Sequence, residues 1–186
     1  HEYPRKVVDC LYDDYQWEPV FFAGNESQEM ANWVSSKYSE AVFQDTMKLR
    51  QAQFDYSRIG PAVPIDADIV NELSSYSLNF IGFLNDATGW SYGFSERKQF
   101  FYEMLKYWNT VINNLRPNLL VMFTRPHTPS CHSLYLLCKY FYKIDVLFLD
   151  PVPFFDRRYH LIGTSIEKLY EPFVKVYESD EVVVPG

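Results

Sequence analysis

The sequence predicts an α/β fold: a Rossmann-like three-layer sandwich with a mostly parallel sheet, forming a single domain over residues 1–186. Short, continuously apolar runs alternate with segments of helical periodicity. Strands that are apolar on every side belong in parallel sheets covered by helices on both faces. The length suits one hydrophobic core, and no internal repeat or low-complexity segment interrupts the chain.

The first 84 residues are predicted to form four helices and two strands. Apolar spacing marks a short amphipathic helix over residues 5–15, although a strand over residues 7–11 is an alternative. Gly24 and Asn25 close the first apolar run, which predicts a strand, and Asn25 is a candidate N-cap for the next helix. The later elements are a strand at 40–45, a helix over 46–54, a proline-containing connection over 58–65 and a long helix over 67–84 with Asp66 as its N-cap.

The second half of the chain holds the clearest helix and the clearest strand. Ser95 is the expected N-cap of a helix that runs to Leu115. An apolar strand follows at residues 119–123, and Thr128 caps the next helix with Pro129 at its first position. A loop over 85–94 is predicted to precede the Ser95 helix. The last predicted elements are a strand at 145–149, a long loop over 151–163 and a helix over 165–177.

Composition excludes some classes of function. The net charge is −7, and no run of basic residues could neutralise a nucleic acid backbone. No stretch is long and apolar enough to span a membrane, which leaves peripheral association with a membrane open. Three cysteines without framework spacing favour a reducing, cytoplasmic setting.

The candidate site follows the strand at 119–123. In open parallel sheets, ligands bind outside the carboxyl ends of the strands, and this end delivers Arg125 and His127. A helix start carrying Thr128 and Ser130 lies beside them, and such a start attracts anions and hydroxyl-rich ligands. His127 is the candidate general base or hydrogen-bond donor. The neighbouring strand end adds further candidates for substrate binding: Asp150, Arg157 and Arg158.

Each of these residues also has a structural interpretation. His127 can cap or orient the turn, and Arg125 can pair with a surface carboxylate. Asp150 precedes a proline, so it can set a turn, while Arg157 and Arg158 can belong to a solvated loop. No metal site is expected, because a fourth ligand at zinc spacing is absent around His127, Cys131 and His132.

Part of the chain resembles bacterial capsule and surface-polysaccharide biosynthesis glycosyltransferases. The similar segment runs from Phe80 to Pro172 and includes "FLND", the helix bearing Trp108, "RPNLLVMFTRPHTPSCHSLYLLCKYFYKIDVLFLD" and "RRYHLIGTSIEK". The resemblance implies a transferase of the GT-B type, with two Rossmann-like domains and a cleft between them. Residues 1–186 would be the N-terminal, acceptor-side domain of a longer chain and inactive alone.

Two hypotheses of different class follow from these observations. In the first, the domain binds a sugar or glycan acceptor at His127 and Arg125, with Trp90 and Tyr92 stacking on sugar rings. It holds no cofactor itself, since the nucleotide-sugar donor would bind in the second domain. In the second hypothesis, the chain is a non-catalytic Rossmann-like module that binds a small ligand or a partner protein.

Overall fold

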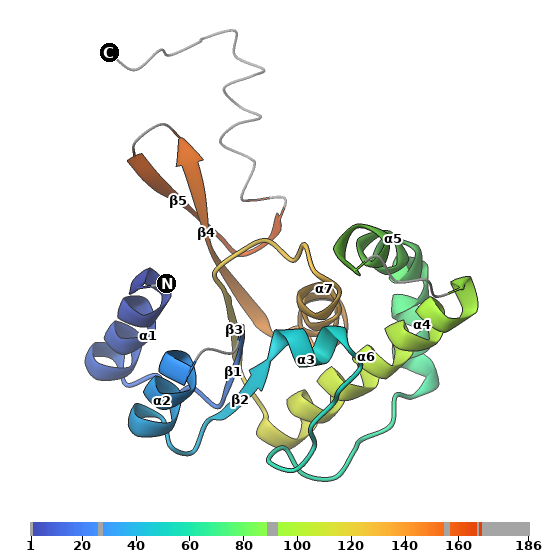
Figure 1. The fold of residues 1–186 in the computed structure, drawn as a ribbon, viewed down its shortest axis with the longest axis horizontal. Coiled ribbons are helices and arrows are strands. Elements are labelled where there is room, and N and C mark those ends of the chain that lie inside the picture. The colour runs from blue at the N-terminus through green and yellow to red at the C-terminus, as the bar shows by residue number, and fades with distance from the viewer. Residues whose placement is uncertain (1, 26–27, 89–92, 155–156, 167, 169–186) are drawn as a thin grey trace, which may run out of the picture.

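The computed structural model describes residues 2–25, 28–88, 93–154, 157–166 and 168 (Figure 1). Its helices are α1 (Glu2–Tyr15), α2 (Gln28–Lys37), α3 (Thr46–Arg50), α4 (Ala67–Leu73), α5 (Ser77–Thr88), α6 (Phe94–Leu115) and α7 (Pro129–Leu136). A 3₁₀ turn at Ser74–Tyr76 links α4 to α5, and a π-helical turn at Leu137–Phe141 extends α7. The strands are β1 (Phe21–Gly24), β2 (Val42–Asp45), β3 (Leu119–Met122), β4 (Asp145–Phe154) and β5 (Arg157–Gly163).

The fold differs from the predicted Rossmann-like sandwich with its mostly parallel sheet. β1 and β2 form a separate two-stranded parallel sheet, while β3, β4 and β5 form a three-stranded mixed sheet. In the second sheet β3 runs parallel to β4, but β4 and β5 are antiparallel and are the longest strands. The prediction was wrong because it assumed that every short apolar run joins one parallel sheet.

The antiparallel hairpin of β4 and β5 replaces the loop predicted over residues 151–163. Pro151 and Pro153 suggested a loop because proline cannot donate a hydrogen bond to a strand ladder. However, β3 pairs with β4 only as far as Phe148, so the β3-facing edge of β4 is unpaired beyond that point among the described residues. Proline nitrogens that face this open edge cost the sheet no hydrogen bond. The hairpin forms a long arm of the molecule (Figure 1).

The first sheet packs against apolar residues on both of its faces, although its strands are only partly buried. Side chains alternate across a strand, so the paired residues Phe21 and Val42 face the main core around α6. The next pair, Phe22 and Phe43, belongs to a smaller cluster with Val34, Tyr38 and Ala41 of the α2 region. Figure 1 shows the same arrangement, with α1 and α2 on one side of the strands and α6 on the other.

Helix α6 forms the centre of the main core. Tyr107 and Trp108 are almost fully buried, and the Trp108 ring meets Phe21 of β1 edge to face at 5.6 Å. The Tyr107 hydroxyl donates a 2.9 Å hydrogen bond to Oε1 of Gln44, which is buried on β2. This bond satisfies two polar groups that would otherwise be costly to bury. The helix therefore anchors the first sheet through both apolar and polar contacts.

Two predicted helix caps, Asp66 and Thr128, are confirmed, and the predicted cap Ser95 is not. Asp66 caps α4 by accepting the Ile69 amide at 2.9 Å, and Thr128 caps α7 with Pro129 behind it. Helix α6 begins earlier than Ser95: Gly93 is its N-cap, and Glu96 Oε2 accepts the Gly93 amide at 2.7 Å. This reciprocal bond from the third helical position is part of a capping box, which the predicted start at Ser95 did not include.

The predicted helix over 67–84 is divided in two by the 3₁₀ turn and then continues to Thr88. The helix predicted from Thr46 ends at Arg50. The last predicted helix, 165–177, lies largely outside the described residues. None of the helices within the described ranges combines the length and the apolar character needed to cross a bilayer.

Candidate functional site

The turn that carries His127 lies where the sequence predicted, at the carboxyl end of β3. The last paired residues of the parallel β3–β4 ladder are Met122 and Phe148. Phe123 follows, and its ring packs edge to face against Tyr3 of α1 at 6.4 Å. The chain then turns through residues 124–128 before α7 begins, with Arg125 and His127 both exposed. The turn therefore presents two cationic or titratable side chains at the rim of the sheet.

A tight hydrogen-bonded turn orients His127. Its backbone amide donates to the carbonyl oxygen of Arg125 at 2.7 Å, which closes a three-residue turn around Pro126. A proline suits the centre of such a turn because its ring restricts φ to the value required. The imidazole Nδ1 lies 2.7 Å from the same carbonyl oxygen and 3.3 Å from the Thr124 hydroxyl. The ring is thus held against its own turn while the residue stays exposed.

Thr128 and Ser130, both predicted to bind a ligand, serve the start of α7. The two residues are buried, and their hydroxyl oxygens lie 3.3 Å apart. Thr128 Oγ1 accepts the Cys131 amide, and the Thr128 carbonyl accepts the His132 amide. Since Pro129 has no amide hydrogen, the first turn offers at most the Ser130 amide to a ligand. The helix start is a weaker anion site than the sequence suggested.

The structure changes the positions expected for Asp150, Arg157 and Arg158. Asp150 lies within β4 rather than at the end of a strand, opposite Leu161 of β5. Two residues beyond the Met122–Phe148 pair, it holds the register position of Thr124, so its backbone remains near the turn. Arg157 and Arg158 lie in β5, opposite Phe154 and Pro153, rather than in a loop. That register places them roughly 10–13 Å farther along the strands, at ~3.3 Å per residue.

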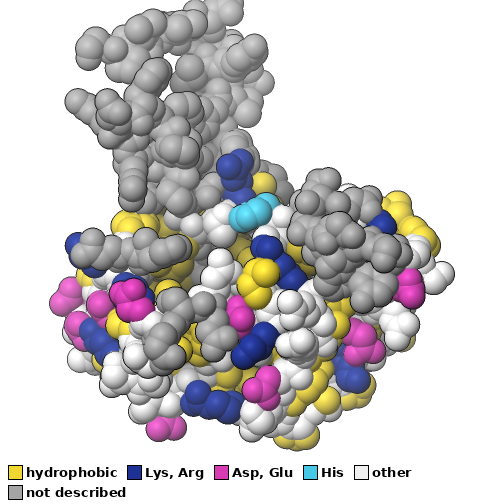
Figure 2. All heavy atoms as spheres, in the orientation of Figure 1, with side chains coloured by type: hydrophobic (Ala, Val, Ile, Leu, Met, Phe, Trp, Pro, Cys, Tyr) yellow, Lys and Arg dark blue, Asp and Glu magenta, His cyan; other side chains and the backbone are white. Residues whose placement is uncertain are grey.

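The structure brings only some of the predicted site residues together at the edge of the sheet where β3 ends. His127 and Arg125 share the turn, and the backbone of Asp150 lies beside it, whereas Arg157 and Arg158 belong to the outer hairpin. The side chains of these three hairpin residues, together with all of Trp90 and Tyr92, lie outside what the structure describes. On the face drawn in Figure 2, histidine colour is visible among the described side chains, with basic side chains above and below it.

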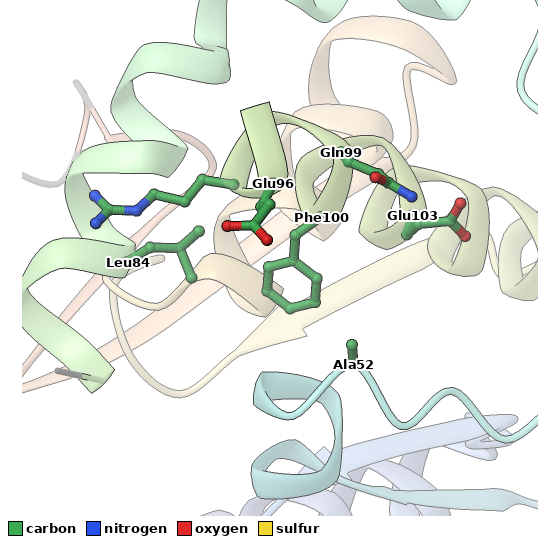
Figure 3. A pocket seen from close by; sticks show the side chains of 7 residues that line it. Ala52, Leu84, Glu96, Gln99, Phe100 and Glu103 are labelled. Atoms are coloured by element: carbon green, nitrogen blue, oxygen red, sulfur yellow. The ribbon is translucent and has the colours of Figure 1, made fainter. Parts of the chain in front are cut away.

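A separate hollow of about 190 Å³ lies between the end of α3, α5 and the first turns of α6 (Figure 3). It is lined by Ala52, Leu84, Glu96, Arg97, Gln99, Phe100 and Glu103. Four of these residues follow helical spacing on one face of α6, so their grouping is visible in the sequence. The hollow is smaller than typical ligand pockets of roughly 300–1,000 Å³, and the Glu96 carboxylate already accepts the Gly93 amide.

Two other titratable groups of the α7 region, His132 and Cys138, are buried rather than poised for chemistry. Burial lowers the pKa of His132 to about 4, so this imidazole is neutral at physiological pH. Burial raises the pKa of the Cys138 thiol to about 12, which keeps it protonated and unreactive. Among the residues that the structure describes, no group of three or more His, Cys, Asp or Glu is arranged to hold a metal ion. Of the two histidines in this region, His127 is exposed at the carboxyl end of β3 and His132 is buried.

Comparison with known proteins adds no relative to this geometry. The chain matches no protein-family model, no curated protein and no solved structure.

Proposed function

We propose that the chain binds a sugar or glycan acceptor at the turn formed by residues 124–128, and that it serves the acceptor side of a glycosyltransferase. The observation that carries the proposal is the exposed imidazole of His127 at the carboxyl end of β3, held in place by the Arg125 carbonyl. Ligands of parallel β-structure bind at this end of the strands. A fixed imidazole can exchange hydrogen bonds with a sugar hydroxyl or accept its proton.

Two neighbouring features support a sugar as the ligand. Arg125 is an exposed residue, and a guanidinium carries several donors in a fixed plane, which suits the oxygens of a carbohydrate. The half-buried rings of Phe123 and Tyr3 lie next to the turn and offer apolar surface to one face of a sugar ring. Donors and an aromatic surface side by side match the amphipathic character of sugars.

A second candidate function is a non-catalytic module that binds a small ligand or a partner protein. It is favoured by the buried hydroxyls of Thr128 and Ser130, which stabilise α7 and leave its first turn with few donors. A transferase site would be expected to use such a helix start to bind an anionic group of its substrate. Under this candidate the chain binds its ligand without contributing to transfer.

Binding measurements on matched variants test the first proposal. Saturation-transfer NMR with N-acetylglucosamine, maltose and UDP-glucose is carried out on the wild type, His127→Ala and Asn118→Ala. Asn118 is exposed like His127 but lies at the opposite, amino end of β3. We expect the His127 variant to lose the sugar signal and the Asn118 variant to keep it. Equal signals from all three proteins, or no signal from the wild type, would refute the sugar-binding proposal.

Transfer assays separate the two candidate functions. The chain is combined with the nucleotide-sugar-binding partner or domain with which it acts, and His127→Ala is compared with Asn118→Ala. A selective loss of transfer in the His127 variant supports the acceptor-side role. Sugar binding without any effect of His127 on transfer favours the non-catalytic module.

A further inference from the structure

The carbonyl oxygen of Arg125 accepts more than one hydrogen bond from the turn that follows it. The backbone amide and the Nδ1 atom of His127 both lie 2.7 Å from this oxygen. The Thr124 hydroxyl is more distant, 3.5 Å from the same oxygen and 3.3 Å from Nδ1. The Arg125 carbonyl is therefore the closest polar partner of the imidazole.

This geometry determines which ring nitrogen carries the proton. A carbonyl oxygen can only accept, so a contact of 2.7 Å requires a hydrogen on Nδ1. An unprotonated Nδ1 would place two lone pairs against each other at that distance. In a neutral imidazole only one nitrogen is protonated, and the bond made by one nitrogen sets the state of the other. Nε2 must then be the unprotonated nitrogen.

We propose that the Arg125 carbonyl acts as a positioning group that holds neutral His127 as the Nδ1–H tautomer, with Nε2 as the atom that accepts the hydrogen bond of a ligand hydroxyl. No described residue hydrogen-bonds Nε2, and His127 is exposed. The ligand part of this statement rests on the proposed function, whereas the tautomer does not. At the β3 edge, His127 is thus a hydrogen-bond acceptor rather than a donor.

The tightness of the turn maintains this state. Pro126 is buried at the centre of the turn and limits its backbone freedom, so the carbonyl of Arg125 stays directed at the ring. Thr124 contributes little, because its hydroxyl lies at the outer limit of hydrogen-bond distance from both the carbonyl and the ring. Loss of the threonine hydroxyl should leave the tautomer unchanged.

Long-range ¹H–¹⁵N NMR on protein labelled at histidine nitrogen tests the tautomer without any ligand. The chain has four histidines, and a His127→Gln sample assigns the signals of position 127. At a pH where the ring is neutral, we expect a protonated Nδ1 and an unprotonated Nε2. The same pattern is expected in Thr124→Val. A protonated Nε2 in the wild type, or a reversed tautomer in Thr124→Val, would overturn the proposal.

Two substitutions at position 127 test the role of Nε2 in binding. Asparagine can keep a donor near the Nδ1 position but has no acceptor near Nε2, whereas glutamine can place its amide oxygen close to the Nε2 position. With N-acetylglucosamine as the probe, we expect His127→Asn to bind about threefold to tenfold more weakly than His127→Gln, the usual loss for one neutral hydrogen bond. Equal binding or the reverse order would show that the ligand makes no hydrogen bond at the Nε2 position and would overturn the inference.

The two proposals can fail separately. If N-acetylglucosamine does not bind but Nδ1 is protonated, the sugar-binding function is refuted and the role of the Arg125 carbonyl stands. If the sugar binds but Nε2 is protonated, the function stands and this inference is wrong.

Discussion

The two parallel strand pairs of the protein end in different ways. At the carboxyl ends of β1 and β2, polar side chains bond to one another or to the next element: Asn25 Oδ1 accepts the Thr46 hydroxyl at 2.8 Å, and Asp45 accepts the Met47 amide at 2.8 Å. At the end of β3, the hydrogen bonds of His127 lie within its own turn, and its side chain remains exposed. The first end serves stability, and the second leaves an imidazole exposed.

This contrast shows that a polar residue after a strand is not in itself a site. Asp45 and Asn25 lie at the carboxyl ends of parallel strands, as the turn of His127 does. The side chains of both nevertheless make hydrogen bonds within the fold. What distinguishes the β3 end is that a backbone hydrogen bond, rather than a side chain, closes its turn. Substitutions at the two ends should therefore separate stability from binding.

The largest effect is expected from Gln44, next to the carboxyl end of β2. Replacing it with alanine in Gln44→Ala leaves the buried Tyr107 hydroxyl without its acceptor and removes buried volume. We expect the free energy of unfolding to fall by about 2–4 kcal/mol, measured by urea denaturation. The double variant Gln44→Leu with Tyr107→Phe removes both polar partners and should recover most of this loss. A double variant no more stable than Gln44→Ala would contradict the role assigned to the bond.

The histidine His132 is buried on α7, whereas His127 is exposed just before that helix. The stability of the protein at acidic pH should depend on the protonation of His132. Its pKa is lowered to about 4 by burial, below the ordinary value of 6.5. The unfolded chain therefore binds the proton more readily, so this stability is fully present above about pH 6.5 and is lost as pH falls towards 4. We expect a loss on the order of 2–3 kcal/mol, because each tenfold difference in proton affinity between the folded and unfolded chain corresponds to about 1.4 kcal/mol.

Denaturation of the wild type and His132→Gln from pH 7 to pH 4 measures this effect. The variant lacks the titrating group, so its stability should depend less on pH in this range, even if it is lower throughout. Parallel pH profiles of the two proteins would contradict a neutral, buried His132.

An intermediate effect is expected at Thr128, because this residue caps α7 and directly follows His127. Its substitution should affect both stability and ligand binding. Thr128→Ala removes the hydroxyl that caps α7, a change that typically costs about 1 kcal/mol. Because Thr128 directly follows His127, we also expect weaker binding of N-acetylglucosamine. Thr128→Ser, which keeps the capping hydroxyl, is the matched control and should restore both properties. Unchanged binding in Thr128→Ala would show that the turn is held without the helix cap.

The smallest effect on stability is expected at the exposed histidine itself. His127→Gln changes no buried contact, so the free energy of unfolding should change by less than about 0.5 kcal/mol. Urea denaturation measures it beside Gln44→Ala. A loss comparable with that of Gln44→Ala would mean that His127 is a structural residue and would remove the contrast between the two strand ends.

The sequence predicted the local elements better than their assembly. The apolar runs at 21–24 and 119–122 and the caps Asp66 and Thr128 are confirmed, since strand apolarity and capping depend on adjacent residues. The prediction of one mostly parallel sheet was wrong, because the antiparallel pairing of β4 with β5 depends on contacts between separate segments. It also depends on an open strand edge, which can accept prolines such as Pro151 and Pro153. No local pattern records which edge of a strand remains unpaired.

Only part of the arrangement of the candidate site could be predicted from the sequence, because the rest depends on contacts that no local pattern encodes. The exposure of His127 follows from its place after a strand, which the sequence shows. The hydrogen bond of Nδ1 to the Arg125 carbonyl depends on turn geometry and could not be predicted from residue types. The positions of Arg157 and Arg158 were wrong because the hairpin was not foreseen.

The most direct test of the account is a map of the ligand contact on the protein. Amide chemical shifts of the wild-type chain are followed by NMR during a titration with N-acetylglucosamine. We predict saturable shifts concentrated at residues 123–130, with little change at Asn25 and Asp45. Shifts concentrated instead around Phe100 and Glu103, which line the hollow on α6, or none at all, would contradict the assignment of the β3 turn as the binding site.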